Sequence, residues 1–224
     1  MTTVYLAGDS TVSNYAAAKA PMAGWGQMLG TFFGEEVAIH NAAMGGRSTK
    51  SFIDEGRLAA IDEKIGAGDY LLIQFGHNDE KEDEARHTTP DGTFPAYLMK
   101  YIEVARAHGA TSVLLSSVER RRFNEKGEVV HTHGDYPDAT ERLAREAGVA
   151  FIDLRRKSKA LLESLGDEPS KRLFCWLKPG ESPNYPDGVT DNTHFSEDGA
   201  KEMARLVVEG IRESGLPLAG QLAK

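Results

Sequence analysis

The sequence of 224 residues contains a single cysteine, Cys175, and no hydrophobic run long enough to cross a bilayer. One cysteine cannot form an internal disulfide, which is typical of proteins from a reducing compartment. A membrane-spanning helix needs about 20 consecutive apolar residues, so we expect no membrane partner. Cys175 lies in the apolar run from Leu173 to Leu177, and we therefore expect a buried packing thiol rather than a reactive one.

Positive charge is also in short supply, because 26 Lys and Arg face 34 Asp and Glu, for a net charge of −8. Nucleic-acid-binding domains are usually basic, so we expect no nucleic-acid partner. The chain, residues 1–224, is short enough to form one domain, since single cores extend to about 250–300 residues. No basic or apolar leader precedes the first predicted strand, so we expect a cytoplasmic location. The sequence leaves the oligomeric state open.

Strand-like and helix-like patterns alternate along the chain. The predicted strands are residues 4–7, 37–39, 70–75, 112–118 and 149–154. The predicted helices are residues 25–33, 57–65, 94–108, 139–147, 158–165 and 197–212, the last with Ser196 as N-cap. The stretch from 166 to 192 is expected to be irregular. This alternation predicts an α/β fold, a three-layer α/β/α sandwich around a five-stranded parallel sheet. Ligands of such sheets bind at the carboxyl ends of the strands.

Polar side chains with catalytic potential follow these strands. Ser10 follows the first strand, Asn78 ends the third, and Asp191 and His194 precede the last helix. A serine can act as nucleophile, an Asp–His pair can take its proton, and an asparagine can donate to an oxyanion. Each of these short segments, taken alone, also fits an ordinary turn or a helix cap. The Gly-x-Ser-x-Gly sequence of the nucleophile elbow is absent. Their placement at one sheet edge nevertheless indicates an acyl-transfer hydrolase.

As a set, these short segments resemble the sequence blocks of the SGNH/GDSL hydrolases, and among them those of the rhamnogalacturonan acetylesterases. The matching segments are residues 3–11, 24–26, 45–48, 75–79, 94–98 and 191–196. The resemblance implies a single SGNH hydrolase domain with a flavodoxin-like sheet of order 2-1-3-4-5. It further implies that Ser10 is the nucleophile, His194 the general base and Asp191 its orienting acid.

The resemblance also implies an oxyanion hole. Its donors would be the backbone N–H groups of Ser10 and Gly46 and the side chain of Asn78. Gly46 is preferred to Gly45 because the glycine of the family directly precedes an Arg-Ser pair. No metal and no organic cofactor is implied.

The implied activity is that of a serine esterase that removes O-acetyl groups from plant cell-wall carbohydrate, above all from acetylated rhamnogalacturonan (pectin) oligosaccharides. Acetylated xylan or another acetylated sugar is the alternative substrate. A metal-dependent hydrolase using His77, Asp79, His131, His133 or His194 is a rival function, and a catalytically silent carbohydrate-binding module is another.

Several residues are candidates for contact with the substrate. Galacturonate carboxylates favour arginine partners, and a sugar face can stack on tryptophan. The candidates are Trp25, Arg47, His77, Arg120, Arg121 and His133, and the arginine run continues to Arg122, which is a candidate with its two neighbours. Each also has a simpler interpretation: a tryptophan at a helix start is often core packing, and a run of arginines is often a solvated loop.

Overall fold

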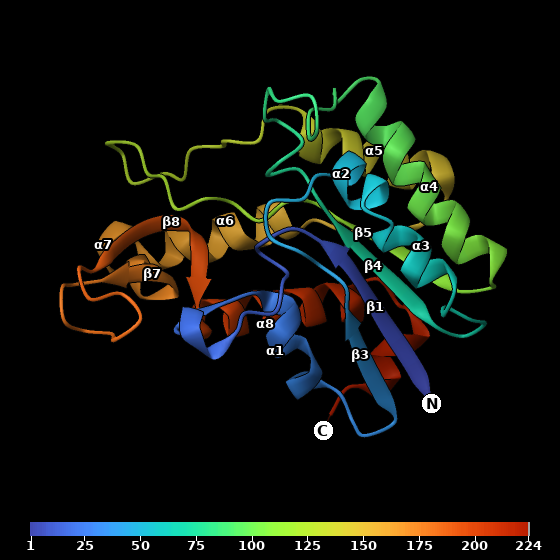
Figure 1. The fold of residues 1–224 in the computed structure, drawn as a ribbon, viewed down its shortest axis with the longest axis horizontal. Helices are drawn as coiled ribbons and strands as arrows, with labels where there is room; N and C mark the ends of the chain where they lie inside the picture. Colours follow the sequence, from blue (N-terminus) through green and yellow to red (C-terminus); the bar gives the residue numbers. More distant parts are fainter. Residues whose placement is uncertain (224) are drawn as a thin grey trace.

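A five-stranded parallel sheet runs through the centre of the computed structural model, which describes residues 1–223 (Figure 1). The strand order is β3-β1-β4-β5-β6. The bounds are β1 (Thr2–Gly8), β3 (Val37–Asn41), β4 (Tyr70–Gln74), β5 (Thr111–Leu115) and β6 (Ala150–Ile152). In chain order these five strands are arranged 2-1-3-4-5, which confirms the predicted fold class and order.

Helices cover both faces of this sheet because the strand side chains alternate between two apolar cores. Val4 and Leu6 of β1 point into one core, and Tyr5 and Ala7 point into the other. The first core is closed by α1 (Trp25–Leu29), α6 (Leu154–Leu165) and α8 (Glu197–Glu213). The second is closed by α2 (Thr49–Asp54), α3 (Arg57–Asp62), α4 (Thr93–Ala107) and α5 (Tyr136–Ala147). The strands are therefore apolar on both sides, as buried parallel strands are.

Helix boundaries depart from the predictions where capping decides them. The helix α6 begins at Leu154 because the Asp153 side chain accepts a hydrogen bond from the backbone N–H of Arg156. The helix predicted over 25–33 ends at Leu29 and continues as a 3₁₀ turn, η2 (Gly30–Phe32). Ser196 caps α8 by accepting from the backbone N–H of Gly199, as predicted. The remaining short helices are η1 (Ala17–Lys19), α7 (Asp167–Ser170), η3 (Lys171–Leu173) and η4 (Pro217–Gln221).

A second, smaller sheet was not expected from the sequence. The stretch predicted to be irregular contains β7 (Phe174–Leu177) and the first half of β8 (Val189–Ser196), which pair antiparallel with each other. The strand β2 (Met22–Ala23) pairs with the other edge of β8. In Figure 1 β7 and β8 stand beside the main sheet, next to α7 and the start of α8. This small sheet carries the Asp191–His194 segment.

Cys175 lies within the small sheet and is fully buried, which confirms the packing interpretation. Burial, followed by the charge of Asp191, raises the pKa of its thiol to about 12. The helices of residues 1–223 are all too short or too polar to cross a membrane.

Candidate active site

The turn that carries Ser10 forms directly after β1 and requires a glycine at its start. A Cβ added to Gly8 would lie 2.6 Å from Cγ2 of Val12 and 2.9 Å from the carbonyl oxygen of Gln74. Any larger residue would push the turn away from the end of β4. Gly8 therefore allows the chain to bend over the sheet edge and present the Ser10 side chain there.

Asp9 and Tyr15 hold this turn from either side. The buried Asp9 carboxylate accepts hydrogen bonds from the backbone N–H and the hydroxyl of Thr11, at 2.9 and 2.8 Å. Burial raises the pKa of Asp9 in spite of these bonds. The Tyr15 hydroxyl donates to the backbone carbonyl of Ser10 at 2.8 Å, and burial raises the pKa of Tyr15 above its usual range. The nucleophile candidate is thus fixed through its backbone.

An irregularity in β8 brings Asp191 and His194 together. Residues three apart on a regular strand point to opposite faces. The pairing of β7 with β8 shifts register between Phe174 and Trp176, and the Asp191 carboxylate accepts from the backbone N–H groups of Thr193 (2.7 Å) and His194 (2.9 Å). This local turn re-aims the two side chains, as bulges near active sites commonly do. The segment is therefore a strand, not the first turn of the last helix.

Ser10, His194 and Asp191 form a continuous chain of hydrogen bonds. His194 Nε2 lies 3.0 Å from Ser10 Oγ, and His194 Nδ1 lies 2.7 Å from Asp191 Oδ2. An ionised carboxylate can only accept, so Nδ1 carries the ring proton and Nε2 is free to accept from the serine hydroxyl. The His194 side chain is 31% exposed, which leaves the group accessible to an ester.

The charge state of Asp191 suits this geometry. Burial alone would raise its pKa, but hydrogen bonds from the His194 ring and from the backbone N–H groups of His194 and Thr193 outweigh burial and lower the pKa. Asp191 is therefore ionised at neutral pH and favours the imidazolium that forms when His194 takes a proton.

The segment after β3 approaches Ser10 closely. The backbone N–H of Met44 donates to the carbonyl of Gly8 at 3.0 Å, which attaches this segment to the end of β1. A Cβ added to Gly45 would lie 3.6 Å from Cβ of Ser10. Gly46 has φ +81°, in the left-handed region that favours glycine. Gly45 therefore lies beside the candidate nucleophile without a side chain between them, and Gly46 is the next residue of the same segment.

Asn78 reaches the same place from the end of β4. Its side-chain amide nitrogen donates to the carbonyl of Arg47 at 3.1 Å. The amide group has two hydrogens, and within residues 1–223 the second one has no partner. One hydrogen thus orients the side chain, while the other is available to a negatively charged oxygen. The structure brings Ser10, Gly46 and Asn78 to one sheet edge, and their role as oxyanion donors stays a proposal.

The three ring side chains predicted to contact substrate are all buried. Trp25 is 1% exposed, and its indole N–H donates to Gln74 Oε1 at 2.8 Å, so the expectation of a sugar-stacking surface is wrong. His133 is fully buried, with its ring 4.3 Å from that of His77. His77 is 3% exposed, and burial lowers its pKa well below the usual range, so the ring is neutral. These side chains are enclosed by the protein and present almost no surface to a sugar.

The arginines predicted to bind a carboxylate differ in availability. Arg47 is 32% exposed but pairs with Glu55 at 2.9 Å. Arg120 is 20% exposed and pairs with Glu80 at 2.5 Å. Arg121 is only 5% exposed and forms an ion pair with Asp167. Arg121 is therefore a structural residue, because its guanidinium is buried and already bonded on several sides.

The residues considered for a metal-dependent hydrolase do not gather into one donor set. His131 Nδ1 lies 2.8 Å from Glu119 Oε1, and His194 is occupied by Asp191 and Ser10. Within residues 1–223, no group of three or more His, Cys, Asp or Glu side chains could hold a metal ion.

Tyr15 and Thr49 support the site although the sequence did not single them out. Tyr15 donates a hydrogen bond to the backbone carbonyl of Ser10. Thr49 donates to the carboxylate of Asp79, which is 30 residues away in the chain. The only local signal was for the helix start, where Ser48 and Ser51 form a capping box. No local sequence pattern predicts the hydrogen bonds of Tyr15 and Thr49 to these partners.

Comparisons with known proteins point in the same direction as the geometry. The sequence matches the GDSL-like lipase/acylhydrolase family over residues 6–202. It is 57% identical to the rhamnogalacturonan acetylesterase RhgT of Bacillus subtilis (strain 168), covering 98% of this chain and 93% of that protein. It is 41% identical to the probable rhamnogalacturonan acetylesterase YesY of the same organism, covering 99% and 97%.

Among solved structures, the crystal structure of YxiM from Bacillus subtilis matches with a TM-score of 0.80 at 30% identity. The match covers 96% of this chain but 57% of that one, so this chain spans little more than half of YxiM. The family of this chain is therefore shown by its sequence, and its fold by both sequence and structure.

Proposed function

The chain belongs to the GDSL-like lipase/acylhydrolase family, and from this premise we propose that it is a serine esterase that removes acetyl groups from rhamnogalacturonan oligosaccharides. The observation that carries the chemistry is the hydrogen-bonded chain from Ser10 through His194 to Asp191. The substrate follows from the relatives RhgT and YesY, which are similar over nearly their whole length.

In the first half of the reaction, Ser10 Oγ attacks the carbonyl carbon of the acetyl ester while His194 Nε2 takes the hydroxyl proton. The carbonyl oxygen becomes an oxyanion, for which the backbone N–H groups of Ser10 and Gly46 and the free Asn78 hydrogen are the proposed donors. The tetrahedral intermediate collapses as the C–O bond to the sugar breaks. The imidazolium of His194 gives its proton to the departing sugar hydroxyl, which leaves acetyl-Ser10.

In the second half, a water molecule takes the place of the sugar. His194 accepts a proton from this water as its oxygen attacks the acetyl carbon. The second tetrahedral intermediate expels Ser10 Oγ, which recovers its proton from His194. Acetate leaves, and the free enzyme is restored. Asp191 stays ionised throughout and stabilises the imidazolium form of His194 in both halves.

The test of this function is acetate release from a panel of acetylated carbohydrates. The panel contains acetylated rhamnogalacturonan oligosaccharides, the parent polymer and acetylated xylo-oligosaccharides, each assayed with the wild type and with Ser10→Ala. We expect release from the rhamnogalacturonan oligosaccharides by the wild type only. Release from xylo-oligosaccharides with none from rhamnogalacturonan would replace pectin by xylan as the substrate. EDTA inactivation that added metal reverses would instead favour the metal-dependent rival.

A further inference from the structure

A cavity of about 410 Å³ lies next to the catalytic strand, and its lining is dominated by arginine. The lining residues are Arg120, Arg121, Arg122, Thr132 and Asn192. Asn192 directly follows Asp191 in β8, so the cavity and the Ser10–His194–Asp191 site share a strand. The arginines belong to the long segment between β5 and α5, which Figure 1 shows in yellow-green, extending away from the main sheet. We call this the arginine cavity.

Two of the three arginines are committed to partners that hold the cavity in place. Arg120 pairs with Glu80, and its guanidinium also donates to the backbone carbonyl and hydroxyl of Thr132, both at 3.2 Å. Arg121 pairs with Asp167 and is buried. These ion pairs leave little unbalanced charge on either side chain. They fix the shape of the walls and do not by themselves call for an anionic ligand.

Arg122 is the exception. Its side chain is exposed, and within residues 1–223 its guanidinium forms neither an ion pair nor a hydrogen bond. It therefore brings a full positive charge and five N–H donors to the rim of the cavity. The lining includes no carboxylate that could neutralise it. In a chain with a net charge of −8, this is a local concentration of positive charge in a cavity that shares β8 with the reaction site.

Asn192 adds an uncharged donor. Its Oδ1 accepts hydrogen bonds from Arg121 Nη1 and from Trp176 Nε1, both at 2.9 Å. Because its oxygen is held by two donors, its amide nitrogen is the group left over, and within residues 1–223 it donates to nothing. The free donors of the cavity are thus the guanidinium group of Arg122 and the side-chain amide of Asn192. A planar group with two acceptor oxygens matches this pair.

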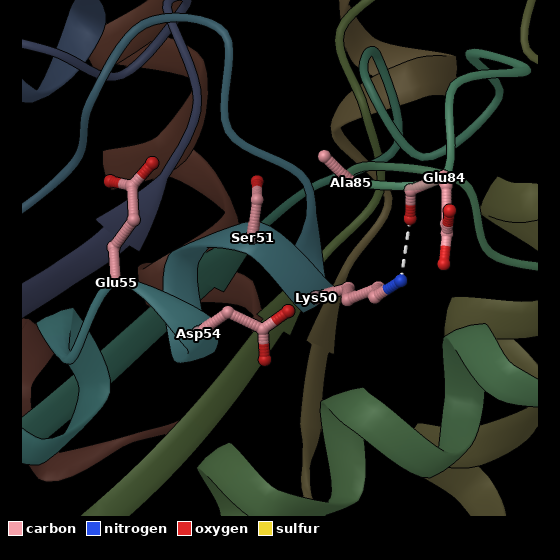
Figure 2. Close-up of a pocket in the computed structure, with 6 residues that line it drawn as sticks. All are labelled: Lys50, Ser51, Asp54, Glu55, Glu84 and Ala85. Atoms are coloured by element: carbon pink, nitrogen blue, oxygen red, sulfur yellow. Dashed lines mark hydrogen bonds between the residues drawn. The ribbon is translucent and has the colours of Figure 1, made fainter.

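A second cavity has the opposite character. It measures about 500 Å³ and is lined by Lys50, Ser51, Asp54, Glu55, Glu84 and Ala85 (Figure 2). Three of these six residues are carboxylates, and Lys50 is turned toward the backbone carbonyl of Glu84 (Figure 2). This cavity would repel an anionic sugar. Of these two cavities, only the arginine cavity has a lining that suits an anionic sugar.

We propose that the arginine cavity binds the carboxylate of a uronic acid residue that neighbours the acetylated sugar, with Arg122 and the Asn192 amide as its donors. This inference rests on the proposed function for the identity of the sugar chain. Among the three consecutive arginines it assigns the specificity for acidic substrates to Arg122, because the charges of Arg120 and Arg121 are already paired. Discrimination between acidic and neutral acetylated carbohydrate then depends on one exposed guanidinium.

The test is direct binding of a ligand that is not turned over. Dissociation constants are measured by calorimetry for an unacetylated rhamnogalacturonan oligosaccharide and for the same oligosaccharide with its carboxylates reduced to alcohols. We expect wild type to bind the acidic form about tenfold more tightly, the scale of one charge-assisted hydrogen-bonded contact. In Arg122→Gln this preference should fall to about twofold or less, since one charged group is lost. Raising the salt concentration should weaken the wild-type preference and have little effect on the remaining preference of Arg122→Gln.

Arg145→Gln is the matched control, because Arg145 is also exposed, lies on α5 and lines neither cavity. It removes the same charge and should keep the wild-type preference. Equal binding of the acidic and reduced forms by wild type, or an unchanged preference in Arg122→Gln, would overturn the inference. The proposed function is tested separately, by measuring acetate release from acetylated rhamnogalacturonan. That activity could be absent while the preference for the carboxylate persists, or present while it does not.

Discussion

The buried carboxylate of Asp79 accepts hydrogen bonds from the backbone N–H and from the hydroxyl of Thr49, at 3.0 and 2.5 Å. Asp79 follows Asn78 at the end of β4, and Thr49 begins α2 directly after the Gly46 segment. A third bond, from the Thr88 hydroxyl at 3.0 Å, completes the arrangement. Asp79 therefore ties together the two segments that carry proposed oxyanion donors.

Asp79→Asn should change how stability depends on pH. Burial raises the pKa of Asp79 to about 7, in spite of the hydrogen bonds from Thr49 and Thr88. An unfolded Asp titrates near pH 3.9. The protonated carboxyl therefore favours the folded state below about pH 4, and this contribution is lost as the pH rises toward 7, at up to about 1.4 kcal/mol per pH unit. The asparagine variant lacks this pH-dependent contribution to the free energy of unfolding, because the asparagine side chain does not ionise.

The measurement is urea unfolding of both proteins at several pH values between 4 and 8. We expect the free energy of unfolding of the variant, relative to wild type, to increase across this range. Asp9, whose pKa is also raised by burial, is present in both proteins, and its charge is one of the causes that raise the pKa of Asp79. A constant difference between the two proteins would show that Asp79 does not titrate there.

Ser10→Ala should abolish turnover of p-nitrophenyl acetate, because no other group in the site replaces the attacking oxygen. The wild type should be labelled covalently by a fluorophosphonate, with the adduct on Ser10 found by peptide mass spectrometry. Ser13→Ala is the control, since the Ser13 hydroxyl donates to the Asp9 carbonyl and does not contact His194. If Ser10→Ala retained wild-type turnover, the nucleophile would have to be sought elsewhere.

Asn78→Ala should lower kcat by roughly 10²- to 10³-fold, the usual loss when one oxyanion donor is removed. KM for p-nitrophenyl acetate should change little, since the donor acts on charge that develops in the transition state. Steady-state kinetics with a circular dichroism check of folding would measure this. A loss below about threefold would remove Asn78 from the oxyanion hole.

Tyr15→Phe should loosen the turn that carries Ser10. The change removes only the hydroxyl that donates to the Ser10 carbonyl, so we expect stability to fall by about 1 kcal/mol. We also expect kcat to fall several-fold at constant KM, because a misplaced nucleophile attacks less often. Tyr97→Phe, on α4, is the control for loss of a tyrosine hydroxyl elsewhere. An unchanged kcat with the expected loss of stability would make Tyr15 purely structural.

The main sheet could be predicted because its signal is local. The apolar run at 70–75 identifies a strand buried on both faces, and helices with an apolar stripe between strands imply parallel pairing. The small sheet could not be predicted in this way. The strands β2 and β7 are short, and β8 pairs both with Phe174–Leu177 and with Met22–Ala23, which lies far from it in the chain. Long-range pairing of this kind leaves no periodicity in any one segment.

Substrate contacts could not be predicted reliably from the sequence, because the burial of each side chain was unknown. Trp25, His133 and Arg121 were chosen by residue type, and type does not reveal exposure. Trp25 is buried because Gln74 accepts its indole N–H inside the core. Arg121 is buried because Asp167 and Asn192 arrive from other parts of the chain to bond its guanidinium. Among three consecutive arginines, only the positions of distant partners decide which charge remains free.

The residues themselves determined the chemistry available to this protein: a serine after a glycine-led turn, an asparagine at a strand end and an Asp–His pair before a helix, in an order that strands deliver to one edge. The tertiary structure decided what these groups can do together. Ser10 and His194 lie 184 residues apart in the chain and meet at 3.0 Å. They meet because β8 pairs with β2 and β7 and bends at Asp191. The direction of a side chain and the pairing of a charge depend on neighbours that only the folded chain supplies.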